Sequence, residues 1–187
     1  KFDEFNKLSL FVNRRVDRPN EVDIRIFPKY DEPELIKVGN PALQPQYSTS
    51  FDLGYKTSWS TGSVYLAAYH RVIDGTITRI ATQAPGSVLL YNVFQNAGRS
   101  TNTGSELVWQ QTISPTLSLN ANASVFRKTV NAFSVVNQYP VPVRYTAERQ
   151  QLTSGNVKLN AVLKWPRDWQ TQLSTVYLAP DLLPQGR

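Results

Sequence analysis

Strict two-residue alternation over long stretches is the feature that most constrains the fold of this chain. In residues 47–56, apolar, aromatic or threonine side chains stand at every second position, with polar side chains between them. This period places one set on a single face of a β-strand, whereas a helix repeats its apolar positions every three to four residues. The clearest apolar phases are Tyr47, Thr49, Phe51, Leu53 and Tyr55; Leu117, Leu119, Ala121, Ala123 and Val125; and Val157, Leu159, Ala161, Leu163 and Trp165.

Weaker alternation extends this pattern over most of the chain. Leu8, Leu10 and Val12 begin it, residues 169–177 continue it, and residues 63–80 and 88–111 read as extended with less regular facing. Helical spacing is not convincing anywhere. The sequence therefore predicts an all-β, antiparallel fold of about seven strands.

The predicted strands are long. Strands of globular proteins usually have about 5–6 residues, and these have about ten or more. Ten residues at about 3.3 Å each, tilted near 45°, span roughly 23 Å, close to the apolar band of an outer-membrane barrel. A large soluble β-sandwich also alternates. Strand pattern and length leave both architectures open.

Composition excludes several other classes of protein. The 187 residues contain 55 Ser, Thr, Asn and Gln but only 34 charged residues, an unusual balance for a soluble cytosolic domain. The absence of Cys excludes disulfides, thiolate metal sites and a Cys nucleophile. No apolar run approaches a transmembrane helix. Because Met is also absent, we expect the chain to be a processed or excised piece of a longer protein.

The connections favour the membrane barrel. Short connections at 58–62, 113–115 and 166–168 alternate with long polar ones at 16–45, 81–87 and 129–149, as in barrels with periplasmic turns and external loops. All four tryptophans lie in or beside the short turns. We therefore predict an interfacial aromatic girdle at one rim of the sheet, formed by Trp59, Trp109, Trp165 and Trp169.

A family resemblance rests on several motifs. Residues 38–47, Val-Gly-Asn-Pro-Ala-Leu-Gln-Pro-Gln-Tyr, followed by the strand at 51–56, are similar to the "GNPxLxPE" segment and next strand in barrels of TonB-dependent outer-membrane receptors. Residues 8–19 resemble the preceding strand, and residues 91–107 resemble a later "N-x-G-x-x-x-x-x-G-x-E" stretch. The nearest resemblance is to outer-membrane β-barrel family proteins. One departure is Gln46, where Glu is commonest.

The motif residues Asn40, Pro41, Leu43, Pro45 and Tyr47 have a structural reading that needs no family. The two prolines fix φ and hold the residue before each in extended geometry. Asn40 before Pro41 favours a turn. We expect a stiff lead-in that sets the start of the next strand, and no direct contact with a substrate.

The resemblance implies a 22-stranded barrel around an N-terminal plug, which imports iron chelates, cobalamin, glycans or peptides with energy relayed by TonB. This sequence has neither a recognisable plug nor a TonB box, and residues 182–187 should lie in an external loop. Residues 1–187 are thus expected to be a partial barrel domain, from the C-terminal part of the barrel and without the plug or the closing strands, in the outer membrane of a Gram-negative cell. The implied partners are lipid and lipopolysaccharide, the rest of the barrel and its plug, the TonB complex through the missing N-terminal part, and a small-molecule, glycan or peptide ligand.

The sequence contains few groups of residues that could form a catalytic or metal-binding site. His70 is the single histidine; Asp74, Ser60 and Ser63 are near it in sequence, but no nucleophile-elbow motif accompanies them. We expect no catalytic residue, cofactor or metal. An outer-membrane hydrolase that uses His70 is the least favoured hypothesis, behind a soluble β-sandwich or adhesin module.

The net charge of +6 comes from scattered basic residues, several on the polar phase of strands, and no nucleic-acid motif is present. We hypothesise that Arg14, Arg15 and Arg18 contact anionic cargo or lipopolysaccharide phosphates. Aromatic residues in the long loops either bind ligand or pack the loops together, and packing is favoured. These are Phe27, Tyr30, Tyr139 and Tyr145.

Overall fold

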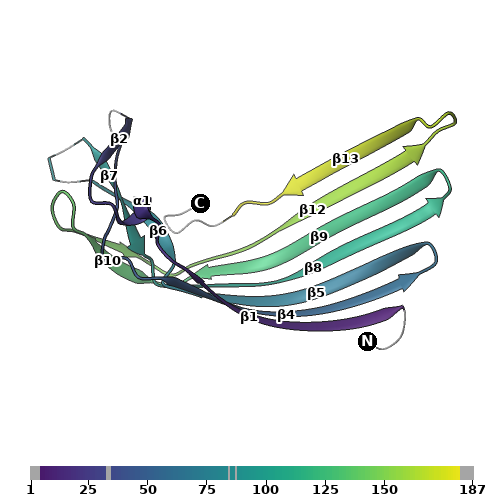
Figure 1. Cartoon of the computed structure of the whole chain (residues 1–187), viewed down its shortest axis with the longest axis horizontal. Coiled ribbons are helices and arrows are strands. Elements are labelled where there is room, and N and C mark those ends of the chain that lie inside the picture. The colour runs from purple at the N-terminus through teal and green to yellow at the C-terminus, as the bar shows by residue number, and fades with distance from the viewer. Residues whose placement is uncertain (1–4, 33–34, 84, 87, 182–187) are drawn as a thin grey trace.

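The computed structural model describes residues 5–32, 35–83, 85–86 and 88–181, together with the side chains of these residues except at 29–32. The residues expected in a last external loop, 182–187, lie outside this part. Seven long strands dominate the fold (Figure 1). They are β1 (Asn6–Asp17), β4 (Gln46–Trp59), β5 (Gly62–Asp74), β8 (Arg99–Ser114), β9 (Leu117–Val130), β12 (Gln150–Lys164) and β13 (Gln170–Leu178).

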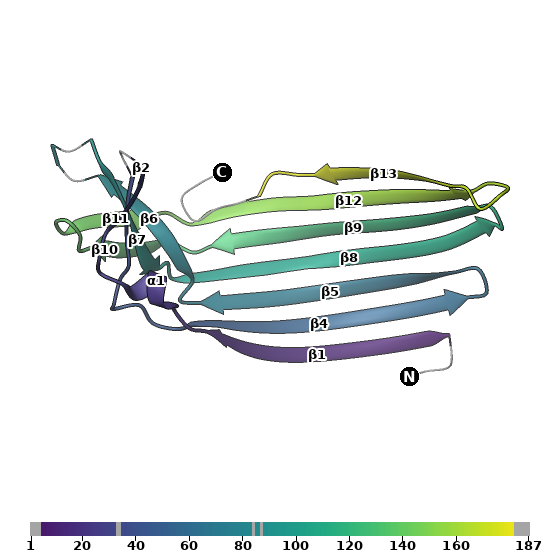
Figure 2. The same cartoon turned by 45° about the horizontal axis from the view of Figure 1, so that its top comes forward.

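These strands form one antiparallel sheet in the order β1-β4-β5-β8-β9-β12-β13, so each pairs with the next long strand along the chain. Figure 2 shows them side by side, with short turns at one end and long connections at the other. Within the described part, β1 and β13 pair along one edge only, so the sheet is an open arc. The prediction of an all-β fold with about seven long antiparallel strands is confirmed.

The register keeps the apolar phases of all seven strands on one face, which we call the outer face. The side chains of this face are uncovered: Leu10 is 70% exposed and Leu53 48%. No second sheet packs on the outer face in the described residues, so the soluble β-sandwich is not supported. One outer row runs through Leu8, Tyr55, Leu66, Leu107, Ala123, Val157 and Tyr177.

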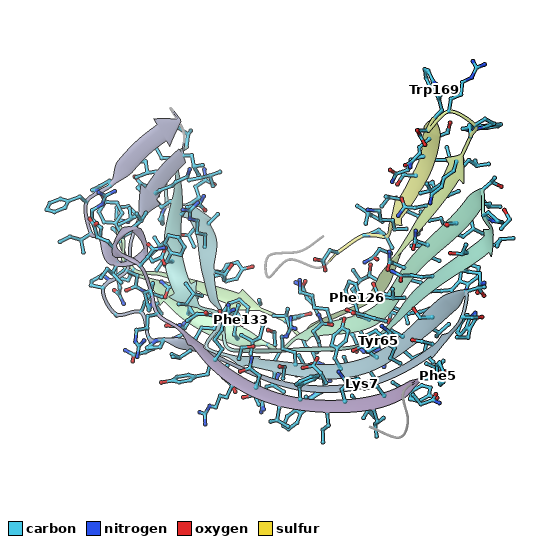
Figure 3. The ribbon with its side chains drawn as sticks, turned by 45° about the vertical axis from the view of Figure 1, so that its right-hand side comes forward. Phe5, Lys7, Tyr65, Phe126, Phe133 and Trp169 are labelled. Atoms are coloured by element: carbon cyan, nitrogen blue, oxygen red, sulfur yellow. The ribbon has the colours of Figure 1, made fainter. Side chains whose placement is uncertain are left out.

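The opposite, inner face carries mostly polar side chains. Lys7, Tyr65 and Phe126 belong to it and lie on the inner side of the curved sheet (Figure 3). Tyr65 lies over Gly54, where an added Cβ would stand 2.5 Å from the Tyr65 hydroxyl oxygen. One inner row runs through Lys7, Lys56, Tyr65, Val108, Asn122, Lys158 and Val176.

The three long connections, residues 18–45, 75–98 and 131–149, fold together into what we call the loop module. Two of them share a four-stranded sheet in the order β2-β3-β7-β6, in which β3 and β7 are parallel, and the third forms the β10–β11 hairpin. The strands of the module are β2 (Lys29–Glu32), β3 (Leu35–Val38), β6 (Ile77–Gln83), β7 (Leu90–Asn96), β10 (Phe133–Asn137) and β11 (Val143–Ala147).

Two predicted extended stretches are interrupted, which corrects the sequence reading. Residues 63–80 do not form one strand, because β5 ends at Asp74 and Gly75 turns the chain with a φ of +68°. Residues 88–111 are likewise divided at Gly98, with a φ of +65°. Left-handed backbone favours glycine. The second long connection is therefore 75–98 rather than 81–87.

The buried core of the described chain lies in and beside the loop module, not between the long strands. One cluster is centred on the fully buried Ile80, which packs with Val130 and Phe133. A second contains Ile36 and Val93 and is covered by Tyr139. The long connections are thus held by apolar burial, as compact domains are.

Helix is limited to a single turn in the described residues, α1 (Glu21–Ile24), as the sequence predicts. Asn20 and Asp23 form a capping box, in which each side chain accepts from the other residue's backbone N–H. No helix in the described part is long and apolar enough to cross a membrane.

Candidate functional site

A chain of amide side chains joins all three connections of the loop module. Asn40, in the first, donates from Nδ2 to the Phe94 carbonyl (3.0 Å) and to Gln95 Oε1 (3.2 Å) in the second. Gln95 Nε2 donates to Asn137 Oδ1 in the third at 2.7 Å. Asn137 Nδ2 returns to the second, donating to the Ile80 carbonyl and to Thr82 Oγ1. Asn137 is fully buried, so these bonds fix the loops to one another without water.

Asn96 joins the bases of two connections. Its Oδ1 accepts from the Gln44 N–H at 2.9 Å, and its Nδ2 donates to the carbonyls of Gln44 and Gly75, both at 2.9 Å. Gln46, the residue that departs from the commonest family residue, accepts from the Ile77 N–H and donates to Asp17 Oδ2. A Glu here could accept but could not donate, and would place a second carboxylate beside Asp17.

The motif residues lie at this junction. Asn40 also accepts from the Ala42 N–H, while Pro41 is exposed and Leu43 is buried. The chain then passes Pro45 and enters β4, where Tyr47 lies on the outer face beneath the Arg14 guanidinium, 5.4 Å from the ring centre. The arrangement agrees with a stiff lead-in to β4. A structural role for these residues stays a prediction.

Gly39 allows the α1 segment to approach. An added Cβ would stand 2.5 Å from both the N and the O of Arg25. Two backbone bonds fix the approach, from the Gly39 N–H to the Arg25 carbonyl (2.9 Å) and from the Asn40 N–H to the Asp23 carbonyl (2.7 Å). The glycine before Asn40 is therefore required by backbone packing.

Several hollows surround these contacts. One of about 320 Å³ lies between the motif residues and Tyr139. A second, of about 230 Å³, lies beside Arg25 and Arg79. A third, of about 260 Å³, is lined by inner-face side chains near the loop module, among them Ser48 and Arg71. These three hollows place ligand-sized space in and beside the loop module, and a larger one, of about 560 Å³, lies on the apolar outer face of the long strands.

The inner face carries an excess of positive charge. Lys7 stands directly opposite Lys56 across β1 and β4, an arrangement that is unfavourable without an anionic neighbour. Of the inner-face basic residues, Arg15 pairs with Asp17 (2.9 Å) and Lys128 with Asp181 (3.3 Å). By register, the inner-face basic residues of the long strands are Lys7, Arg15, Lys56, Arg71, Lys128, Lys158 and Lys164, against the acidic Asp17, Asp52 and Glu106.

The three arginines expected to act together do not share a surface. Arg15 faces inward, whereas Arg14 faces outward over Tyr47. Arg18 lies beyond the end of β1, in the first long connection. Because Arg14 faces outward, the hypothesis of a contact with lipopolysaccharide phosphates applies to Arg14. Because Arg15 faces inward, the hypothesis of a contact with anionic cargo applies to Arg15.

The tryptophans lie at the short-turn end of the sheet. Trp59 ends β4, and Trp109 belongs to the outer phase of β8. Trp165 and Trp169 stand on either side of the last turn, joined by a backbone bond of 2.8 Å, and Figure 3 shows Trp169 at the far tip of that hairpin. Trp59 Nε1 donates to Gln111 Oε1 and Trp165 Nε1 to Thr171 Oγ1. Their role as an interfacial girdle stays a prediction.

The structure brings no triad together around His70. His70 Nδ1 lies 2.7 Å from Thr103 Oγ1 on the outer face, and Asp74 forms its ion pair with Arg99 at 3.2 Å. Among the described residues, no cluster of three His, Asp or Glu side chains could hold a metal ion. The observed arrangement does not support a hydrolase centred on His70.

The loop aromatics divide between packing and exposure. Tyr139 packs edge-on against Tyr91, with ring centres 5.7 Å apart, and Tyr145 packs against Phe133 at 6.0 Å. These two residues therefore hold loops together, as favoured from the sequence. Phe27 is 72% exposed. The side chain of Tyr30 lies outside the described part.

Comparison with known families decides the class of the protein. The model of the family described as "Outer membrane protein beta-barrel family" matches residues 1–187. The chain belongs to this family. Outer membrane protein beta-barrel family members lie in the outer membrane, and this chain accordingly contributes an integral β-barrel sheet to it. Its exposed apolar outer face is what such a location requires. No curated protein matches the sequence.

Solved structures agree on the fold. The siderophore receptor PirA from Pseudomonas aeruginosa aligns with a TM-score of 0.58 at 12% identity, over 95% of this chain and 40% of that one. A mutant of the ferric enterobactin receptor PfeA from the same organism aligns with a TM-score of 0.52 at 11% identity, over 93% and 32%. The chain therefore spans less than half of either receptor. At these identities the likeness concerns the fold alone.

Proposed function

We propose that residues 1–187 are part of the barrel of a TonB-dependent outer-membrane receptor that takes up a nutrient ligand. The single observation that carries this proposal is the two-sided sheet: an apolar outer face, a polar inner face, and an ordered loop module at one end with ligand-sized hollows. The fold-level likeness to PirA and PfeA supports it. In this proposal the remaining barrel strands and a plug complete the receptor, and the TonB complex acts through the plug side.

The two ends of the sheet then have different surroundings. The turn end, with Trp59, Trp109, Trp165 and Trp169, lies at the periplasmic membrane interface as an aromatic girdle. The loop module faces the outside, where ligand arrives. Arg14 is at the level of the lipopolysaccharide phosphates. The motif from Asn40 to Tyr47 sets the entry of β4 and does not contact the ligand.

Uptake is favoured over catalysis because the buried amides of the loop module bond to each other, and the described residues bring no triad together around His70. The hydrogen-bonded amides Asn40, Gln95 and Asn137 are suited to fixing loops. His70 faces outward, away from the inner wall. A receptor without enzymatic activity is the simpler account of this distribution.

Uptake by intact cells tests the proposal. Strains with and without the intact protein, each with TonB active or inactivated, are given ⁵⁵Fe chelates, ⁵⁷Co-cobalamin, labelled oligosaccharides and labelled peptides in parallel. We expect at least one probe to accumulate only when both the protein and TonB are present. If every probe accumulates equally in cells with and without the protein, the transport proposal is wrong.

A further inference from the structure

The hollow of about 230 Å³ in the loop module combines three basic and two aromatic side chains in its lining. It lies on the opposite face of the four-stranded loop sheet from the buried core, since Arg79 stands opposite Phe94 and alternates with the buried pair Ile80 and Val93. The segment that follows α1 closes it on the other side. The side chains used below are Arg25, Phe27, Lys37, Arg79 and Phe94.

Two arginines, Arg25 and Arg79, line this hollow. Arg79 lies over the Phe94 ring, 4.6 Å from its centre, and forms no ion pair within the described residues. Arg25 has a carboxylate neighbour, Glu21, but at 3.9 Å and with both side chains exposed, so that pair is weak. Lys37 adds a third basic side chain. Guanidinium groups present planar sets of N–H donors that match carboxylate and phosphate oxygens.

The walls are fixed before any ligand binds. The segment carrying Arg25 is bonded to Gly39 and Asn40 through its backbone, at 2.9 and 2.7 Å. The Arg79 guanidinium is held over the Phe94 ring, 4.6 Å from its centre. Fixed walls reduce the entropy lost when a ligand binds.

We propose that this hollow, which we call the aryl-anion site, binds a small aromatic acid: one ring bearing a phosphate or a carboxylate. The two arginines hold the acid group, and the exposed Phe27 and the edge of Phe94 contact the ring. Because binding pockets for whole drug-sized ligands measure about 300–1,000 Å³, the ligand is either a single-ring molecule or the terminal ring of a larger one. The inference names the ligand class of the proposed receptor and rests on that function.

Direct binding tests this site. The intact protein, purified in detergent, is titrated with phenyl phosphate by calorimetry or ligand-observed NMR. We expect Arg79→Gln to weaken phenyl phosphate binding at least tenfold and Arg25→Gln to weaken it as well. Arg144→Gln, on an exposed residue of β11 outside the hollow, is the matched control and leaves binding unchanged. Equal affinity of the Arg79→Gln and Arg144→Gln proteins would overturn the assignment.

Further probes distinguish the contribution of the acid group to binding from that of the ring, and they distinguish a soluble ligand from a lipid. Benzyl alcohol and inorganic phosphate should each bind at least tenfold more weakly than phenyl phosphate, and equal binding of either overturns the corresponding half of the proposal. Lipopolysaccharide should not displace phenyl phosphate; displacement would assign the hollow to lipid phosphate instead. Since no step requires transport, failure here leaves the uptake proposal standing, and failure of uptake leaves a binding result intact.

Discussion

Asn137 shows how single polar residues organise the loop module. It is fully buried, yet its Oδ1 accepts one hydrogen bond and its Nδ2 donates two. A buried polar network with every partner present gives the surrounding segments one arrangement. Loss of one member leaves the other buried groups without partners, which is costly.

We therefore expect Asn137→Ala to destabilise the loop module by about 2–3 kcal/mol, since the Ile80 carbonyl and the Gln95 amide each lose a partner. Hydrogen exchange of the intact protein in detergent measures this. Exchange should become faster in β6, β7 and β10 and stay the same in β4 and β5.

Ser134→Ala is the matched control for Asn137→Ala. Ser134 is also in β10, but it is exposed, and within the described residues its hydroxyl forms a single hydrogen bond, with Thr146 Oγ1 at 3.2 Å. Its removal should change stability by less than about 0.5 kcal/mol. Unchanged exchange in the Asn137→Ala protein would show that the amide chain does not hold the module together.

The sequence indicates Asn40 through its motif, but gives little sign of Gln95 and Asn137. An Asn or Gln in a long connection ordinarily reads as exposed, and the partners of these residues are 40 or more positions away. One sign was available for Gln95: it shares the phase of Tyr91 and Val93, both buried. The residue pattern alone does not show which distant loops pair with one another.

The long strands carry apolar side chains on their outer face and mostly polar side chains on their inner face over most of their length. On β4, the outer phase from Phe51 to Trp59 covers eight residue steps, or about 19 Å of depth at a tilt near 45°. The row of Phe51, at the loop end of that stretch, is already polar on the neighbouring strands, with Phe51 opposite His70, His70 opposite Thr103 and Thr103 opposite Arg127. The long strands thus extend past the membrane toward the loop module.

Ala123 and Asn122 of β9 provide a matched pair for this division. Ala123 lies in the middle outer row and Asn122 in an inner row. We expect Ala123→Arg to destabilise the protein in lipid by about 2–4 kcal/mol, because it places a cation at the bilayer midplane. Asn122→Arg, which places a cation opposite Lys158 on the polar inner face, should cost no more than about 1 kcal/mol.

Urea unfolding of the two proteins in lipid vesicles gives the comparison. A larger effect of Asn122→Arg, or equal effects, would show that the faces are assigned the wrong way or that the sheet is not in lipid. The same design fits any adjacent pair in the middle of β5 or β12.

The long strands could be predicted because they have 9 to 16 residues, long enough for a two-residue alternation to stand out in most of them. The strands of the loop module could not, since they have only 4 to 7 residues, too few for a two-residue period to stand out from the surrounding loop sequence. The parallel pairing of β3 and β7 joins residues more than 50 positions apart. The breaks at Gly75 and Gly98 depend on backbone angles that a glycine permits but does not require.

At the scale of the whole molecule, the two faces of one sheet lie in two different environments, and the loop module stands at one end of the sheet. The outer face requires lipid, the inner face requires water or polar partners, and the loop module has its own apolar core. These three properties together separate an outer-membrane barrel segment from a soluble β-protein. The central claim is therefore that the odd-numbered residues from 117 to 125 of β9 face lipid and the even-numbered residues between them face the interior.

A nitroxide scan of β9 tests this claim most directly, because the chain contains no native cysteine to remove. Single cysteines at positions 117–125 of the intact protein in lipid are spin-labelled, and their collision rates with oxygen and with a water-soluble nickel complex are compared. The account predicts a two-residue period, with oxygen favoured at 117, 119, 121, 123 and 125 and nickel favoured at 118, 120, 122 and 124. Uniform access to nickel, or the opposite phase, would contradict it.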